Sequence, residues 1–165
     1  MPRVTRSKTI HAPLEDVWGL LADPYHLPRW WPRVERVEGV HVSGDSGRAR
    51  WTSVMKTEAG AVVRADFRRV SAAEPSRLIW EQETEGTPFE RIMHHSRVEV
   101  MLDRAGGETR VKLTANQRLR GLSRLGAGMM RRGTARTLDE ALDGLEQALG
   151  GGSPSPAAPA RRMDT

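Results

Sequence analysis

Six consecutive segments with a two-residue hydrophobic period limit the possible folds of this chain most strongly. In such a segment, alternate side chains point to opposite faces, as they do in a β-strand. Short breakers such as "SGDSG", "EAG" and "RAGG" separate the segments, so consecutive strands should pair as hairpins. The expected strands are residues 34–43, 48–57, 61–71, 77–85, 89–103 and 108–119. The pattern therefore predicts an antiparallel meander.

Helical patterns flank this block. Residues 12–23 have acidic side chains near their start and an apolar face, which predicts a short helix, and residues 24–32 predict a second short helix or turn. Residues 122–149 carry leucines three or four positions apart, which predicts a long amphipathic helix. Residues 3–11 are extended in character and form the expected first strand.

A seven-stranded antiparallel sheet must bury one of its faces, and the last helix is the only long amphipathic element available to cover it. We therefore expect an α+β fold, in which the sheet curls around this helix and encloses a cavity. The folded domain should span residues 1–149. Residues 150–165 are rich in Gly, Pro and Ser and are expected to be a disordered tail.

Composition excludes several classes of function. The chain of 165 residues has no Cys, which excludes disulfides, thiolate nucleophiles and cysteine-bound metals. No apolar run approaches the roughly 20 residues that span a bilayer, and no secretory h-region is present, so we expect a cytoplasmic protein. His94 and His95 are adjacent on an expected strand and point to opposite faces, so we predict no metal site and no cofactor.

Period-two parity predicts which side chains face the cavity. The inward rows are mainly apolar, and a few polar groups interrupt them, as in small-molecule sites. The alternative is that these polar groups reach solvent at strand ends or pair with one another. The expected ligand contacts are Trp31, Trp51, Met55, Phe67, Trp80, Gln82, Ser96, Gln117 and Met129.

His94 shares the inward parity of its strand with Ile92 and Ser96. It is the inward group that titrates near neutrality, so it is a candidate general acid or base. The alternative is a hydrogen-bonded core histidine.

The order of elements, together with "APLEDVW", "LPRWWPRV", "AAEPSRLIWE" and "LDEALDGLEQAL", resembles the START-like or Bet v 1-like (SRPBCC) superfamily. Within it, the chain looks most like the polyketide cyclase/dehydrase group, over about residues 3–149. The resemblance implies a helix-grip fold with a deep cavity for hydrophobic or aromatic small molecules. Some members cyclise and dehydrate polyketides, and many carry lipids.

The resemblance also implies a role for Arg69. In aromatase/cyclase relatives an arginine at the matching place in "ADFRRV" points into the cavity and holds a carbonyl. Arg69 would then polarise a carbonyl and His94 would move a proton, in a cofactor-free aldol cyclisation or dehydration. A one-residue bulge would exchange the roles of Arg68 and Arg69, and a solvent-exposed arginine is the other alternative.

Two other functions are compatible with the same cavity or surface. One is a non-catalytic carrier or sensor of a lipid, isoprenoid or metabolite, and the other is a protein-interaction domain. Residues 118–136 contain six arginines and no acid, which makes an acidic acyl carrier protein a candidate partner. The alternative is a solvated helix face. We expect no nucleic-acid partner and no stable membrane insertion.

The adjacent Trp30 and Trp31 lie between two prolines. A single tryptophan recurs near this place in the superfamily, so the resemblance implies that Trp30 packs in the core. Trp31 is then the expected cavity wall or lid.

Overall fold

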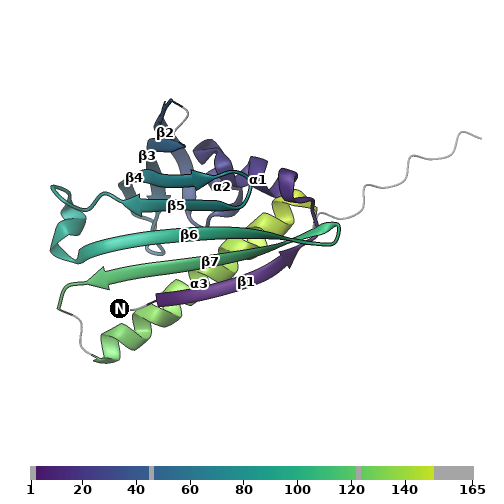
Figure 1. The fold of residues 1–165 in the computed structure, drawn as a ribbon. Helices are drawn as coiled ribbons and strands as arrows, with labels where there is room; N and C mark the ends of the chain where they lie inside the picture. Colours follow the sequence, from purple (N-terminus) through teal and green to yellow (C-terminus); the bar gives the residue numbers. More distant parts are fainter. Residues whose placement is uncertain (1–2, 45–46, 122–123, 151–165) are drawn as a thin grey trace, which may run out of the picture.

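The fold is built on a single antiparallel sheet of seven strands (Figure 1). The computed structural model describes residues 3–44, 47–121 and 124–150. The strands are β1 (Arg3–Ile10), β2 (Val34–Ser43), β3 (Arg48–Lys56), β4 (Val62–Ala73), β5 (Arg77–Gln82), β6 (Met93–Ala105) and β7 (Glu108–Leu119). The helices are α1 (Leu14–Ala22), η1 (Pro24–His26), α2 (Leu27–Trp30), η2 (Pro88–Arg91) and α3 (Arg124–Leu149).

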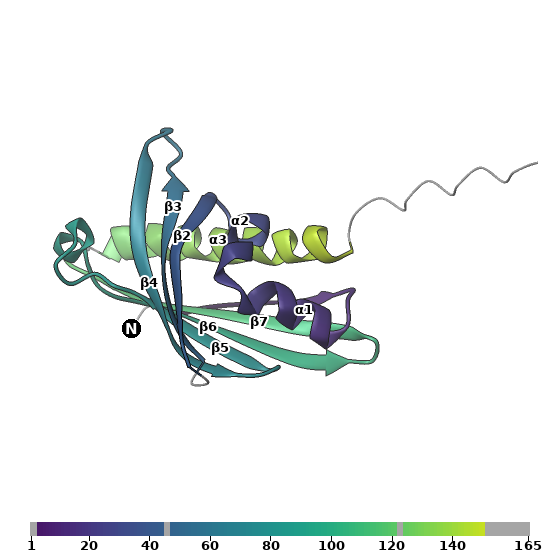
Figure 2. The same cartoon turned by 90° about the horizontal axis from the view of Figure 1, so that it is seen from above.

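The strand order is β1-β7-β6-β5-β4-β3-β2, and all neighbouring strands are antiparallel. The short helices α1, η1 and α2 carry the chain from β1 at one edge to β2 at the other. The curved sheet wraps around α3, which runs along its concave side, and the short helices lie beside one half of α3 (Figure 2). The predicted helix-grip architecture is confirmed.

The strand prediction was wrong around residue 90. Residues 88–91 form the 3₁₀ helix η2 instead of the start of a strand. Pro88 fixes its own φ near a helical value, and the Thr87 hydroxyl accepts a hydrogen bond from the Phe89 N–H at 3.3 Å, so a turn is favoured over extended chain. The segment expected as a disordered tail falls, from residue 151 onward, outside the described residues.

The apolar face of α3 fills the concave side of the sheet. Leu138, Ala141, Leu142 and Leu145 are all at most 2% exposed. They are part of one core cluster that also contains side chains of α1, α2 and the inward rows of the sheet. Truncating a fully buried leucine of this kind lowers the free energy of unfolding by about 2–5 kcal/mol, so these residues stabilise the packing of α3 against the sheet.

Gly144 allows α3 to approach α2 closely. A Cβ atom at this position would lie 3.0 Å from the Cα atom of Trp30 and closer still to its carbonyl oxygen. No side chain fits into that distance, so glycine determines how near the helix comes to the backbone that carries the tryptophan pair.

The convex face of the sheet carries an ion-pair row across three strands. Glu81 of β5 lies opposite Arg68 of β4 and Arg97 of β6. It accepts hydrogen bonds from Arg97 Nε at 2.8 Å and Arg68 Nη2 at 3.1 Å, and is only 9% exposed. Burial alone would raise the pKa of Glu81, but the hydrogen bonds from Arg97 and Arg68 outweigh it and hold that pKa below its usual value.

Candidate functional site

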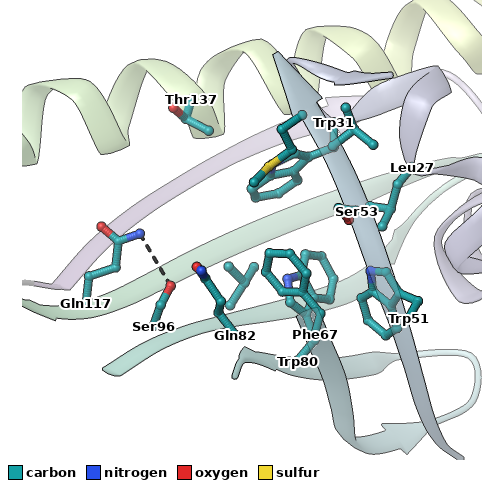
Figure 3. Close-up of a pocket in the computed structure, with 13 residues that line it drawn as sticks. Leu27, Trp31, Trp51, Ser53, Phe67, Trp80, Gln82, Ser96, Gln117 and Thr137 are labelled. Carbon is teal, nitrogen blue, oxygen red and sulfur yellow. Dashed lines mark hydrogen bonds between the residues drawn. The ribbon is translucent and has the colours of Figure 1, made fainter. Parts of the chain in front are cut away.

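A pocket of about 180 Å³ lies between the concave face of the sheet, α2 and α3 (Figure 3). The side chains that the sequence predicted to contact a ligand line it, with the exception of Met129. The lining residues are Leu27, Trp31, Val34, Trp51, Ser53, Met55, Phe67, Trp80, Gln82, Ser96, Val98, Gln117 and Thr137.

Strand register brings these side chains together from distant parts of the chain. Gln117 of β7 lies opposite Ser96 of β6, Gln82 of β5 lies opposite Phe67 of β4, and Phe67 lies opposite Trp51 of β3. Because facing residues in antiparallel strands share a side of the sheet, these five side chains form a row across the concave face.

Aromatic rings form one end of the pocket. Trp51 stacks on Phe67 with ring centroids 5.9 Å apart, and Trp80 meets Trp51 edge-on at 6.5 Å and Trp31 edge-on at 5.6 Å. Edge-to-face and offset-stacked rings in this range attract one another beyond simple burial. The rings therefore pack against one another and form an apolar wall of the pocket.

Polar side chains form the other end, where Gln117, Ser96 and Gln82 lie together (Figure 3). Thr134 Oγ1 donates to Gln117 Oε1 at 3.2 Å, and Gln117 Nε2 donates to Ser96 Oγ at 3.4 Å. Gln82 Nε2 is buried and has no hydrogen-bond partner in the described part of the chain, and the same holds for the Trp51 indole N–H. Buried donors without a partner are rare in folded proteins, and two of the residues that line this pocket carry one, as does Trp30 in the core.

The two adjacent tryptophans have different environments. Trp30 is 3% exposed and belongs to the core cluster, whereas Trp31 lines the pocket. Their rings meet edge-on at 5.4 Å. The structure thus places Trp30 in the packing and Trp31 on the pocket wall, as predicted.

Leu27 and Thr137 line the pocket but were missed, because neither lies on a strand. Thr137 directly precedes Leu138 on the inner side of α3, so it is a polar interruption of an apolar helical stripe. The reasoning that singled out Gln82 and Ser96 on their strands could have found Thr137 if it had been applied to the helix. Val34, Ser53 and Val98 also line the pocket.

The prediction for Met129 was wrong in its placement. Met129 is 67% exposed and does not line the pocket. It lies on α3 two turns before Thr137, on a part of the helix where the residues from 128 to 133 are mostly exposed. The apolar stripe of α3 begins only later, at Leu138, so methionine identity at position 129 carries no information about the pocket.

The inward placement of Ile92 and His94 was also wrong. Ile92 ends η2 and is 57% exposed. The pairing of β6 with β7 shifts by one residue between Met93 and His95, and this irregularity leaves His94 as an extra residue on the exposed side. Desolvation, together with the nearby charges of Arg120 and Arg118, lowers the pKa of His94 from its usual value.

Arg69 keeps the predicted inward parity, since the irregularity of β4 comes after it, between Arg69 and Ser71. Arg68 faces the other side, where it pairs with Glu81. However, Arg69 does not line the pocket. Its Nε donates to Gly47 O at 2.5 Å and its Nη1 donates to Ala22 O at 2.6 Å, so it ties the end of α1 to the β2–β3 turn. Burial lowers the pKa of Arg69, and Asp23 partly opposes this effect.

The pocket is electrically neutral: in the described part of the chain, the side chains that line it carry aliphatic, aromatic, thioether, hydroxyl or amide groups. Within the described ranges, no cluster of three or more His, Asp or Glu side chains is arranged to hold a metal ion. The described helices include none that is long and apolar enough to cross a membrane. The arrangement can therefore enclose an apolar body and hydrogen-bond it, without an ionisable group in contact.

A curled sheet that grips a long helix over an aromatic-walled pocket defines a protein of the helix-grip type. The family described as "Polyketide cyclase / dehydrase and lipid transport" matches residues 1–150, and the chain belongs to this family. No curated protein matches it significantly.

Solved structures with the same fold include an aromatase/cyclase. The Zhui aromatase/cyclase from Streptomyces sp. R1128 is 20% identical, with 92% of this chain and 98% of that chain covered at a TM-score of 0.64. A protein from Thermus thermophilus is 24% identical over 89% of this chain and 96% of its own, with a TM-score of 0.68. A START superfamily protein from Mycobacterium smegmatis is 12% identical over the same shares, with a TM-score of 0.72.

Proposed function

We propose that this protein binds a small, flat, largely apolar molecule in the pocket under α3, and that the ligand presents a neutral hydrogen-bond acceptor to the polar end. The observation that carries this proposal is the combination of an uncharged aromatic compartment with buried donors that lack partners, Gln82 Nε2 and the Trp51 indole N–H.

The size of the pocket limits the ligand. An apolar cavity of about 150 Å³ accommodates benzene. At about 180 Å³, the pocket suits a body of one or two rings, and a longer molecule would have to extend beyond it.

The hydrogen-bonding groups limit the ligand further. Gln117 uses its carbonyl oxygen for Thr134 and its amide nitrogen for Ser96, so it is already engaged on both sides. The unpaired donor of Gln82 remains, and a buried donor without a partner costs about 1–3 kcal/mol. A ketone, quinone or amide oxygen would recover this free energy, whereas a hydroxyl hydrogen or an ammonium group would not.

Polyketide cyclisation is the second candidate, and membership of the polyketide cyclase/dehydrase family favours it. In an intramolecular aldol step, an enol carbon bonds to a carbonyl carbon, and the carbonyl oxygen gains the proton that the enol loses. Amide and hydroxyl donors at Gln82 and Ser96 would polarise that carbonyl. Because Arg69 and His94 lie outside the lining, solvent would have to carry the proton. An acidic acyl carrier protein stays a candidate partner here, since Arg131 and Arg132 of α3 are exposed.

A matched pair of probes tests the binding proposal. 2-Acetonaphthone carries a ketone oxygen, and 2-ethylnaphthalene has nearly the same shape without it. We expect tryptophan fluorescence titration to show saturable binding of both, with the ketone bound about five- to tenfold more tightly, since a neutral hydrogen bond contributes about 1 kcal/mol. Gln82→Met should remove the preference, and Gln147→Met on the exposed side of α3 should retain it. Equal affinities in the unmodified protein would contradict the acceptor requirement.

A second experiment distinguishes a carrier function from an enzymatic function. Native mass spectrometry of the freshly purified protein detects a retained ligand, and incubation with a poly-β-ketone analogue detects cyclised product. A co-purified molecule without turnover supports the carrier, and cyclised product above the uncatalysed background supports the enzyme.

A further inference from the structure

A second hollow of about 420 Å³ adjoins the pocket. The two share Trp31, Val98, Gln117 and Thr137 in their walls, so one leads into the other. We call this second hollow the vestibule. Arg33 and Glu58 bound it on one side, and α3 residues including Met130, Thr134 and Arg136 bound it on the other.

Gln117 lies at the boundary between the two compartments. It accepts from Thr134, which lines the vestibule, and donates to Ser96, which lines the pocket. A ligand that fills the pocket and continues outward must therefore pass Gln117 and enter the vestibule.

The charge of the vestibule differs from that of the pocket. The pocket walls are neutral, whereas the vestibule has two arginines and one glutamate. Glu58 is engaged by Arg33, whose Nη2 lies 3.1 Å from Glu58 Oε1. Arg136 is exposed, and the described residues supply it with no hydrogen-bond or ion-pair partner. The vestibule thus has a net positive charge and a guanidinium group available to a ligand.

The backbone of Arg33 supports a functional role for this compartment. Its φ is 65°, in the left-handed region, and no other non-glycine residue in the described ranges has a positive φ. Arginine in this conformation costs on the order of 1 kcal/mol relative to glycine. The Lys56 N–H donates to Arg33 O at 3.0 Å, and Glu58 holds the side chain, so neighbouring groups maintain the strained conformation. A strained residue with a charged side chain at the mouth of a pocket is typical of ligand contacts.

We infer that the ligand is an aromatic acid, whose ring system occupies the pocket while a carboxylate lies in the vestibule near Arg136 and Arg33. This inference rests on the proposed binding function and adds the ligand's charge and orientation to it. The carboxylate keeps part of its hydration in the open vestibule, so it avoids the large cost of burying an ion. The planar guanidinium of Arg136 matches a carboxylate in a two-point hydrogen bond.

A charge-matched pair of probes tests the inference by isothermal titration calorimetry at low salt. 2-Naphthoate carries the carboxylate, and 2-naphthamide has the same ring and carbonyl without the charge. We expect the protein to bind naphthoate about three- to tenfold more tightly, because exposed ion pairs contribute about 0.2–1 kcal/mol each. Arg136→Gln should weaken naphthoate binding about threefold and leave naphthamide binding unchanged.

Arg132→Gln is the matched control. Arg132 lies one helical turn before Arg136 on α3 and lines a different hollow, beside β1, so the variant makes the same change of charge at a residue that does not line the vestibule. It should leave the affinity for naphthoate close to that of the unmodified protein.

The possible outcomes separate the inference from the proposed function. Equal affinity for naphthoate and naphthamide, or an equal loss in the Arg132→Gln and Arg136→Gln variants, would overturn the inference and leave the binding function standing. If neither probe binds the unmodified protein, the binding function itself is contradicted for ligands of this size.

Discussion

Alanine at position 144 tests how the tryptophan pair is held at the pocket. Gly144 of α3 faces the backbone of Trp30, and the pocket wall Trp31 is the next residue along the chain. The Gly144→Ala substitution adds a single methyl group on the helix, and the three atoms nearest to it belong to the backbone of Trp30, which does not line the pocket. Any effect on the pocket must therefore pass through the contact between α3 and α2.

The size of the effect follows from the geometry. The new Cβ would lie 3.0 Å from Trp30 Cα and closer still to Trp30 O, and ordinary contact begins near 3.4 Å. The two helices would have to separate by about 1 Å, since the atoms of the Trp30 backbone cannot rotate away as a flexible side chain could. Overpacking of this kind costs about 1–3 kcal/mol, against a gain of about 1 kcal/mol from the better helix propensity of alanine. We expect a net loss of up to about 2 kcal/mol and weaker binding of 2-acetonaphthone.

Urea unfolding followed by circular dichroism measures the loss in the free energy of unfolding. The midpoint should fall while the m-value stays the same. Gly128→Ala is the control, because a Cβ at that position of α3 meets nothing within 4 Å and should stabilise the helix by up to about 1 kcal/mol. If Gly144→Ala is as stable as Gly128→Ala, the close approach of the helices does not constrain the pocket.

Substitutions at Arg69, Glu81 and the tryptophan pair test three other side-chain environments. Arg69→Ala leaves the carbonyl oxygens of Ala22 and Gly47 without their donor. Thermal unfolding should therefore show a loss of about 1–3 kcal/mol in the free energy of unfolding, while the affinity for 2-acetonaphthone hardly changes. A normal melting temperature together with lost affinity would mean that Arg69 contacts the ligand. Because the pKa of Glu81 is lower in the folded protein than its usual value near 4.5, the stability contributed by its ion pairs should be present above pH 4.5 and lost as pH falls below it. Glu81→Gln should lower the free energy of unfolding by about 2 kcal/mol at pH 7 and remove most of its dependence on acid pH. Urea unfolding at a series of pH values measures both effects. If the variant keeps the pH dependence of the unmodified protein, the ion pairs of Glu81 are not its source. Trp31→Phe should weaken ligand binding severalfold with little effect on stability. Trp30→Phe should lower the free energy of unfolding by about 1–3 kcal/mol with less effect on affinity. If Trp30→Phe instead weakens binding and Trp31→Phe instead lowers stability, Trp30 is the pocket wall and Trp31 the core residue.

The side of the sheet to which a side chain points was predictable within the strands, because alternation along a strand depends only on neighbouring residues. The inward rows of β3, β4 and β7 follow directly from alternation, and with them the pocket residues Trp51, Phe67 and Gln117. The long spacing of leucines in α3 likewise specified which face is buried, since helix geometry repeats every 3.6 residues.

Errors arose where alternation is interrupted. The irregularity between Met93 and His95 inserts one residue, and this reverses the direction of His94 without any signal in the hydrophobic pattern. Parity also places Arg69 on the inner face but cannot say what covers it there. The covering groups, Ala22 O and Gly47 O, come from elements 47 and 22 residues away in sequence, and only the folded structure brings them within hydrogen-bond reach.

Nuclear Overhauser contacts between a bound ligand and methionine methyl groups show where on the protein the ligand binds. The chain has seven methionines, of which Met55 lines the pocket and Met129 is 67% exposed. With methyl-labelled protein and 2-acetonaphthone, we expect contacts between the naphthalene protons and the Met55 methyl group and none to Met129. Contacts to Met129 without any to Met55 would show that the ligand binds outside the pocket under α3, which contradicts the proposed site.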